Sequence, residues 1–286
     1  MDLEKEIQQA ARLVKDPAGR QVRVLEDQEA VRLAAASGLS PAAVYETALA
    51  REIVPYRYLR NHECISVNDQ LRLARSRVAV VGAGGLGGNV ILLLARIGVG
   101  RIVVVDSDRF DETNLNRQAL SSMETLGLPK AEVAARMVEG INPGVEVIAH
   151  TARLDPSNGI SLLRGTQVVV DALDNVASRF ALQDAARDLN IPLVHGAIAG
   201  FEGQAMTIFP EDRGMNLLYG KNPKGEKSGR PTPEAMLGVP AITPALIAAL
   251  QAMEVLKILL DRGRVLRKTM LHADLETGRI EEFSFG

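Results

Sequence analysis

The residues best suited to chemistry are a glycine-rich turn and the charged and amide side chains that follow it, between positions 82 and 130. Within the turn, glycine stands at Gly82, Gly84, Gly85 and Gly87. Such glycines let the backbone bend sharply and approach a nucleotide closely, and the N-terminus of the next helix offers free N–H groups to phosphate. The pattern therefore predicts a nucleotide-binding site.

The polar residues after the turn indicate which nucleotide this site takes. Asp106 ends an apolar run about 20 residues beyond the turn, where an acidic side chain can accept both ribose hydroxyls. Asp108 follows and either contacts the nucleotide or only orients its loop; Asn114, Arg117 and Lys130 come next. Two cations after the ribose acid favour a triphosphate over a nicotinamide. An NAD-dependent oxidoreductase that uses the same turn is the alternative.

Alternating strand and helix patterns must position these residues. Strands are predicted near residues 78–82, 102–106, 145–149, 167–172 and 192–196, and helices near 86–97, 130–140, 157–164 and 175–189. This alternation predicts an α/β fold, a Rossmann-like and mostly parallel sheet flanked by helices, with right-handed crossovers. Asp174 and Asn175 come at the end of one strand, the edge where open α/β sheets bind their ligands.

The pattern changes after residue 200. Residues 203–209 alternate like a half-exposed strand, and residues 210–233 form a loop rich in Gly, Pro, Lys and Arg, long enough to be functional or disordered. The strongly apolar segment 240–260 predicts a buried helix. Residues 268–285 predict a hairpin that turns at 276–278. We therefore expect antiparallel C-terminal strands.

The first 55 residues are predicted to be an N-terminal helical extension, with helices at 4–14, 27–36 and 41–50. Ser40 is the expected N-cap of the third helix and Pro41 its first residue. The last two helices have the spacing of a helix-turn-helix unit. Because the second of them has no basic residues to meet phosphates, we interpret the extension as an accessory cap and not as a DNA-binding unit.

Composition limits the classes of protein to consider. The chain has 286 residues, 47% of them hydrophobic, and a net charge of −2, so nothing in the charge favours nucleic acid or an anionic membrane as a partner. A single cysteine, Cys64, excludes an intrachain disulfide framework. No apolar run approaches the length of a membrane span, and the first residues do not resemble a secretory signal. We expect a cytoplasmic protein.

Several motifs together resemble the ThiF/MoeB/HesA family, the bacterial relatives of ubiquitin-activating enzymes. They follow one another along the chain as Arg57-Tyr-Leu-Arg-Asn61, the turn at 82–87, Asp106-Ser-Asp108, Asn114-Leu-Asn-Arg-Gln118, Pro129-Lys130, Asp174-Asn175, Phe201-Glu-Gly-Gln204 and Leu250-Gln-Ala-Met-Glu-Val-Leu-Lys257. The resemblance covers residues 56–286, divided into a nucleotide-binding half (77–197), a crossover loop (210–238) and a C-terminal helix and hairpin (240–286).

The resemblance implies an activity. Members of the family bind ATP with Mg²⁺ and join AMP to the C-terminal carboxylate of a ubiquitin-like, β-grasp sulfur carrier that ends in Gly-Gly. It also implies residue roles. Gly85 would approach the phosphates, Asp106 would hold the ribose, and Asp174 would bind the magnesium. Asn114, Arg117 and Lys130 would face the phosphates. Arg60 would reach the triphosphate of the partner subunit in a homodimer.

The sequence also departs from the family. Many relatives bind a structural zinc through two CxxC pairs; here the first region reads Met215-Asn-Leu-Leu-Tyr219 and the C-terminal tail has no cysteine, so no zinc is expected. Some relatives have a cysteine in the crossover loop, and residues 210–240 contain none. We therefore expect adenylation without a covalent thioester step. The basic segment 221–230 either guides an acidic carrier or is only solvated.

Other interpretations remain open. Asp171 is interpreted as structural, and Asn175 as a helix N-cap, a neighbour of the magnesium, or both. Cys64 is interpreted as an incidental thiol. For the whole chain the alternatives to a carrier-activating enzyme are adenylation of a peptide or other small carboxylate, the NAD-dependent oxidoreductase, and a scaffold that binds nucleotide without turnover.

Overall fold

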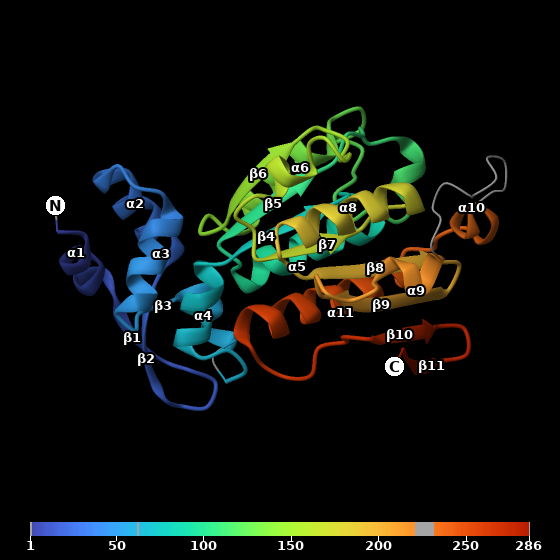
Figure 1. The fold of residues 1–286 in the computed structure, drawn as a ribbon. Helices are drawn as coiled ribbons and strands as arrows, with labels where there is room; N and C mark the ends of the chain where they lie inside the picture. Colours follow the sequence, from blue (N-terminus) through green and yellow to red (C-terminus); the bar gives the residue numbers. More distant parts are fainter. Residues whose placement is uncertain (1, 62, 221–231, 286) are drawn as a thin grey trace.

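The computed structural model describes residues 2–61, 63–220 and 232–285, and at its centre is an eight-stranded mixed sheet (Figure 1). The strands lie in the order β11-β10-β9-β8-β7-β4-β5-β6. Their bounds are β4 (Arg77–Val81), β5 (Arg101–Val105), β6 (Glu146–His150), β7 (Val168–Asp171), β8 (Leu193–Ala199), β9 (Glu202–Ile208), β10 (Thr269–Asp274) and β11 (Arg279–Ser284). Neighbours from β6 to β8 are parallel and those from β8 to β11 antiparallel. This confirms the predicted Rossmann-like fold and its antiparallel C-terminal strands.

Helices cover both faces of the sheet, which is why its central strands are apolar on both sides. In β4, Val78 and Val80 pack into one core, while Ala79 and Val81 pack into the other. The first core is closed by α5 (Gly85–Ile97), α6 (Lys130–Ile141) and α11 (Ile242–Leu260). The second is closed by α7 (Gly159–Leu163), α8 (Val176–Asp188) and α9 (Met215–Tyr219). The predicted helices of the nucleotide-binding half are thus present, with ends shifted by a few residues.

The antiparallel end of the sheet corrects one expectation. Strand β9 was expected to be half exposed, but from Ala205 to Ile208 every residue is buried. The reason is that α11 lies against β9 on one face while Met206 and Ile208 enter the second core on the other. The predicted hairpin is confirmed as β10 and β11, and β11 forms an exposed edge of the sheet.

The N-terminal extension is not purely helical. It contains three helices, as expected: α1 (Leu3–Ala10), α2 (Asp27–Ser37) and α3 (Pro41–Ala50). It also contains a small sheet of β1 (Arg12–Lys15), β2 (Gln21–Leu25) and β3 (Val54–Pro55). The predicted helix 4–14 was therefore too long, because a turn at 16–19 lets residues 12–15 pair with β2. Ser40 caps α3 as expected, since its side chain accepts a hydrogen bond from the N–H of Ala43.

The extension packs against the end of the sheet where the parallel strands begin, and Figure 1 shows it, in blue, at the opposite end of the molecule from α10 (Pro233–Leu237). The junction is made by η1 (Tyr56–Asn61) and by α4 (Val67–Ala74). Tyr58 is 3% exposed, belongs to the core of the extension, and accepts a hydrogen bond from Asn142 Nδ2 at 2.7 Å. Gly144 lies so close to the Tyr45 ring that an added Cβ would come within 2.0 Å of it. The two units therefore share one tightly packed boundary.

Helix α11 is long and apolar, with a mean hydropathy of 1.6 over its most apolar window. It meets the length and composition criteria for a membrane span, although no apolar run of that length was expected from the sequence. Half of that window is buried inside the protein. Helix α11 lies against α5, β8 and β9, and its buried Glu254 accepts hydrogen bonds from Thr207 Oγ1 and from the N–H of Leu266, both at 2.7 Å. These contacts are typical of a core helix. Its opposite side is exposed at Ile242 and Met253, so the helix is less completely buried than expected.

Candidate functional site

A cavity of about 890 Å³ lies at the carboxyl ends of the parallel strands. The glycine turn, the ends of β5 and β7, and residues 232–239 line it. Ligand sites of open α/β sheets occur at this edge, and their volumes are on the order of 300–1,000 Å³. The cavity has the size and the place of a nucleotide site.

The floor of the cavity is built by the glycine turn between β4 and α5. Gly82 has a φ of +94°, and a Cβ there would lie 2.5 Å from the carbonyl oxygen of Ala172. Gly87 contacts the same turn, because its Cβ would lie 1.7 Å from the carbonyl oxygen of Gly82. These contacts bring the N-terminus of α5 up to the cavity, which Gly84 and Gly85 line. An anion there would meet unpaired N–H groups and the positive end of the helix dipole.

Asp106 extends from the end of β5 into the cavity wall. Its two carboxylate oxygens accept hydrogen bonds from the N–H groups of Ala83, at 2.6 Å, and Asp108, at 2.7 Å. Burial raises the pKa of the Asp106 carboxyl above its ordinary value, and the two N–H groups and the Lys130 ammonium oppose that rise. The carboxylate is thus held in a fixed orientation beside the glycine turn, as a ribose-binding acid requires.

Lys130 begins α6, and its side chain is only 8% exposed. Its ammonium lies 3.3 Å from the Asp108 carboxylate, which is itself 66% exposed. A buried cation at the N-terminus of a helix is opposed by the helix dipole and by the cost of desolvation. One exposed carboxylate compensates only weakly for that cost. The arrangement therefore favours binding of an anion in the cavity next to Lys130.

Arg117 also lines the cavity, near Gly85 of the glycine turn. Its guanidinium donates hydrogen bonds from Nη1 to the carbonyl oxygen of Thr113 at 2.8 Å and to Asn116 Oδ1 at 2.9 Å. Both Asn116 and Arg117 line the cavity, and Asn116 Nδ2 donates to the carbonyl oxygen of Val239 at 3.4 Å. None of these partners is a carboxylate. The positive charge of Arg117 is therefore not matched by an acidic side chain among these contacts.

Asp174 and Asn175 also line the cavity, from the loop between β7 and α8. Asn175 Nδ2 donates to Asp174 Oδ1 at 3.2 Å, and Asn175 Oδ1 accepts from the N–H of Ser178 at 2.9 Å. Asn175 is therefore the N-cap of α8 as well as the neighbour of Asp174, so both expected roles are compatible. Asp174 is exposed to the cavity.

The donor set fits a magnesium ion held together with a nucleotide. Among the described residues no group of three or more His, Cys, Asp or Glu side chains could hold a metal by itself. Mg²⁺ is commonly bound by one or two carboxylates together with substrate phosphates and waters. Asp174 lines the same cavity as Arg117 and Lys130 and its carboxylate is exposed there, so Asp174 is the residue that would hold the ion.

The structure brings most of the predicted residues together and leaves three apart. Those that line the cavity are Gly82, Gly84, Gly85, Asp106, Asp108, Arg117, Lys130, Asp174 and Asn175. Gly87 instead packs beneath the turn. Asn114 is buried outside the lining, where its Oδ1 accepts from the N–H of Asp111 at 3.0 Å. Arg60 is exposed on η1 and does not line this cavity.

Other charged residues line the cavity that the sequence did not point to. They are Arg153, after β6; Arg179, on α8; and Glu234, on α10. The only sequence signal for Arg153 was its place just after a predicted strand, at the same edge of the sheet. Nothing in the sequence marked Arg179 or Glu234. The predicted basic segment 221–230 lies outside the described residues.

Taken together, the site offers an anion the helix N–H groups and cations that include Arg117 and Lys130. It also offers an acid for a ribose and an acid for a divalent cation. This set suits transfer of a phosphorus-containing group, in which catalysis depends on positioning and charge neutralisation.

Comparison with known proteins gives a family and a fold. Residues 57–285 match the model of the ThiF family. The chain is 45% identical over 205 residues to the SAMP-activating enzyme E1 of Haloferax volcanii, covering 72% of this chain and 75% of that protein. It is 43% identical over 208 residues to the sulfur carrier protein adenylyltransferase of Thermus thermophilus, covering 72% and 77%. Among solved structures it is similar in fold to E. coli MccB crystallised with ATP, with a TM-score of 0.64 and 21% identity, covering 80% and 71%.

Proposed function

The chain belongs to the ThiF family, and from that premise we propose that it is an ATP-dependent adenylyltransferase that activates the C-terminal carboxylate of a ubiquitin-like sulfur carrier. The carboxylate would attack the α-phosphorus of ATP. A bond forms between a carboxylate oxygen and the α-phosphorus. At the same time the bond between the α-phosphorus and the oxygen that bridges to the β-phosphate breaks, which gives acyl-AMP and pyrophosphate. Because a C-terminal carboxylate is already ionised at pH 7, no general base is required.

The observation that carries this proposal is the meeting of Arg117, Lys130 and Asp174 around the N-terminus of α5 in one cavity. An oxidoreductase that binds NAD through the same turn needs the ribose-binding Asp106. It does not need the cations Arg117 and Lys130 or the second acid, Asp174. Attack of a carboxylate on ATP brings further negative charge to an already polyanionic group. Cations held in place for that charge are what the reaction requires.

Each residue then has a role. The N–H groups at Gly84 and Gly85 bind phosphate oxygens, and Asp106 binds the ribose. Lys130 and Arg117 neutralise charge on the phosphates. When bound, Mg²⁺ held by Asp174 would add charge neutralisation to the triphosphate. Asn175 orients Asp174 through their hydrogen bond.

The partners are proposed as well. We infer that the carrier ends in Gly-Gly, as the family resemblance implies, and that the enzyme is a homodimer in which Arg60 serves the partner's site. The exposed side of α11 supports the dimer. Ile242, Ala245, Ala249 and Met253 are exposed at the spacing of one helix face. All four are apolar, which is unusual for a face in contact with water.

The deciding measurement is ATP–[³²P]pyrophosphate exchange by the purified protein, with and without candidate carrier proteins that end in Gly-Gly. We expect exchange only when a carrier is present, and loss of exchange when the last glycine of the carrier is deleted. ATP binding without exchange for any carrier would favour a peptide or small carboxylate as substrate. Tight binding of NAD in place of ATP would overturn the proposal.

A further inference from the structure

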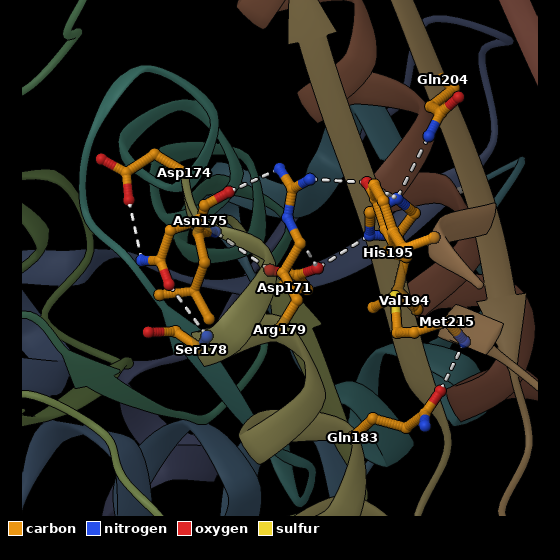
Figure 2. Close-up of polar contacts among 12 residues, drawn as sticks. Asp171, Asp174, Asn175, Ser178, Arg179, Gln183, Val194, His195, Gln204 and Met215 are labelled. Carbon is orange, nitrogen blue, oxygen red and sulfur yellow. Dashed lines mark hydrogen bonds and ion pairs between the residues drawn. The ribbon is translucent and has the colours of Figure 1, made fainter. Parts of the chain in front are cut away.

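Arg179 is a buried cation behind the cavity with no role in the reaction described above. It lies on α8, is 4% exposed, and forms part of the cavity wall. Figure 2 shows its guanidinium between the loop that carries Asp174 and the neighbouring strand. Its Nη2 donates to the carbonyl oxygen of Leu173 at 2.7 Å, and its Nη1 donates to the Tyr219 hydroxyl at 2.6 Å. Burying a guanidinium is costly unless such bonds compensate for it.

The peptide next to Asp174 is held from both sides by this cluster. Asp171 Oδ1 accepts a hydrogen bond from the N–H of Leu173 at 3.0 Å, while Arg179 donates to the carbonyl oxygen of the same residue. Leu173 directly precedes Asp174 in the chain. We call this pair of contacts the Leu173 clamp. It fixes the backbone from which the Asp174 carboxylate extends, and the Asn175 cap fixes the next residue.

The clamp is anchored on a fully buried pair. His195, on β8, and Asp171 are both 0% exposed, and His195 Nδ1 lies 2.7 Å from Asp171 Oδ2. Arg179 Nε lies 3.6 Å from that same oxygen, so the Asp171 carboxylate has two positively polarised neighbours. These two contacts hold the Asp171 carboxylate in place. The clamp thus rests on the sheet and not on a surface loop.

Tyr219 connects the clamp to a second element. It is the last residue of α9, and its ring lies under the Arg179 guanidinium, with 5.6 Å from Cζ to the ring centroid. The same ring meets His195 edge-on, with centroids 6.0 Å apart. The Tyr219 hydroxyl lies 3.4 Å from His195 Nε2. Tyr219 therefore supports Arg179 from α9.

We propose that Arg179 is a positioning residue, which sets the Asp174 carboxylate for the divalent cation by clamping Leu173 and is itself held in place by Tyr219 on α9. This inference rests on the proposed function, since it assigns Asp174 to the metal. In this proposal the Asp171–His195 pair is a rigid structural support for the Leu173 clamp.

The test compares three variants in the full-length protein. Arg179→Lys keeps the charge but cannot make both hydrogen bonds, and Tyr219→Phe removes one hydroxyl. Gln183→Met is the matched control, because Gln183 Oε1 accepts from the N–H of Met215 at 2.6 Å and so joins the same two helices away from the Leu173 clamp (Figure 2). Mn²⁺ is titrated into each protein with saturating ATP, and free Mn²⁺ is followed by electron paramagnetic resonance.

We expect Arg179→Lys to weaken Mn²⁺ binding by about 10-fold or more, as is typical when a residue that supports a metal ligand is changed. Tyr219→Phe should weaken it less, by roughly 3- to 10-fold, because one of several supports is lost. ATP affinity measured in EDTA should stay at the wild-type value in both. Gln183→Met should lower Tm and leave Mn²⁺ binding unchanged.

If Arg179→Lys and Tyr219→Phe lower Tm as Gln183→Met does and leave Mn²⁺ affinity unchanged, Arg179 is only structural and the proposal is overturned. The titration needs no carrier protein. Weakened Mn²⁺ binding in a protein that adenylates no carrier would therefore refute the proposed function and leave the clamp standing. Carrier-dependent exchange by the wild type, together with unchanged Mn²⁺ binding in the two variants, would support the proposed function and refute the clamp.

Discussion

Both ends of the parallel sheet bury polar side chains, but the two ends differ in how completely those side chains are hydrogen-bonded within the protein. At the amino ends of the strands, where the extension packs, Asn142 is 0% exposed and completely bonded. Its Nδ2 donates to the Tyr58 hydroxyl and to the carbonyl oxygen of Ala95, both at 2.7 Å, and its Oδ1 accepts from the N–H of Gly144 at 3.0 Å. At the carboxyl ends, Lys130 is nearly as buried and has one exposed carboxylate as its partner.

This difference separates structural from functional polar groups. A buried polar group whose bonds are all made inside the chain stabilises one conformation and has nothing left for a ligand. A buried cation with a weak partner lowers stability and binds an anion more strongly for the same reason. Variants at the two ends should therefore change different quantities, activity at one and stability at the other.

The largest effect is expected at the cavity. Arg117→Ala should lower the rate of ATP–pyrophosphate exchange by at least about 10- to 100-fold, equivalent to about 1.4–2.7 kcal/mol of transition-state stabilisation. Its matched control is Arg101→Ala at the amino end of β5, where the arginine pairs with Glu146 on the surface. Such a pair contributes little, so this control should exchange like the wild type. Equal exchange rates in Arg117→Ala and Arg101→Ala would contradict the distinction between a functional and a structural end of the sheet.

The next effect is expected at the junction with the extension. Asn142→Ala leaves the Tyr58 hydroxyl, a carbonyl oxygen and an N–H group without their partner, which should cost about 2 kcal/mol or more. For a chain of this size Tm should fall by roughly 4–8 °C, measured by calorimetry. Exchange at 20 °C should fall much less than in Arg117→Ala, because Asn142 does not line the cavity. A fall in exchange as large as that of Arg117→Ala, in protein that is still folded, would contradict the comparison.

A third effect depends on pH. Burial lowers the pKa of the His195 imidazole, while an unfolded histidine titrates near pH 6.5. The unfolded chain therefore binds a proton that the folded chain does not, and stability is lost as pH falls below about 6.5, by up to about 1.4 kcal/mol per pH unit. His195→Gln should reduce this loss, as measured by urea unfolding at pH 7.5, 6.5 and 5.5. The same slope in both proteins would mean that His195 is charged in the folded state.

The contact between Asn142 and Tyr58 should show no such pH dependence between pH 5.5 and 7.5, because burial raises the pKa of Tyr58 to about 12. Asn142→Ala should therefore lower stability by the same amount at pH 7.5 and at pH 5.5. A change in that amount between the two values would show that the junction contains a titrating group.

The smallest effects compare two helix caps, one from each region. Ser40→Ala and Asn175→Ala each remove an N-cap bond and should each cost about 1 kcal/mol, or roughly 2–4 °C in Tm. Asn175→Ala should also raise the Mg²⁺ concentration needed for half-maximal exchange, because it removes the partner of Asp174. Ser40→Ala should not. If both caps affect only Tm, Asn175 has no part in metal binding.

The sequence was sufficient for the parts of the fold that local chemistry determines. The runs of valine in β4, β5 and β7 and the glycine turn that follows β4 defined the parallel sheet and its ligand edge. Residues 12–15 were harder, because four residues fit a helical period as well as a strand. Their conformation is decided by pairing with β2 across a turn, which is a tertiary contact. The burial of β9 likewise depends on α11, which lies 34 or more residues further along the chain.

The candidate site divides in the same way. Asp106 and Asp174 could be predicted because they end strands, and the ends of parallel strands meet at one edge. Arg179 could not, since its contribution depends on α8 and α9 bringing it to Leu173 and Tyr219. Asn114 was assigned to the phosphates through the resemblance, yet its side chain caps a local turn. Side chains that act through a neighbouring element leave no local signal.

The shared boundary at Tyr58 has one more consequence, for conformational entropy. Tyr58 is fixed by the extension on one side and by Asn142 on the other, and Arg60 follows it by two residues on η1. A long side chain that reaches a distant target loses less freedom when the backbone beneath it is already ordered. Arg60 is proposed to act in the site of another subunit, and the N-terminal extension keeps its backbone ordered before that contact forms. Without it, the same contact would have to order a whole segment of chain.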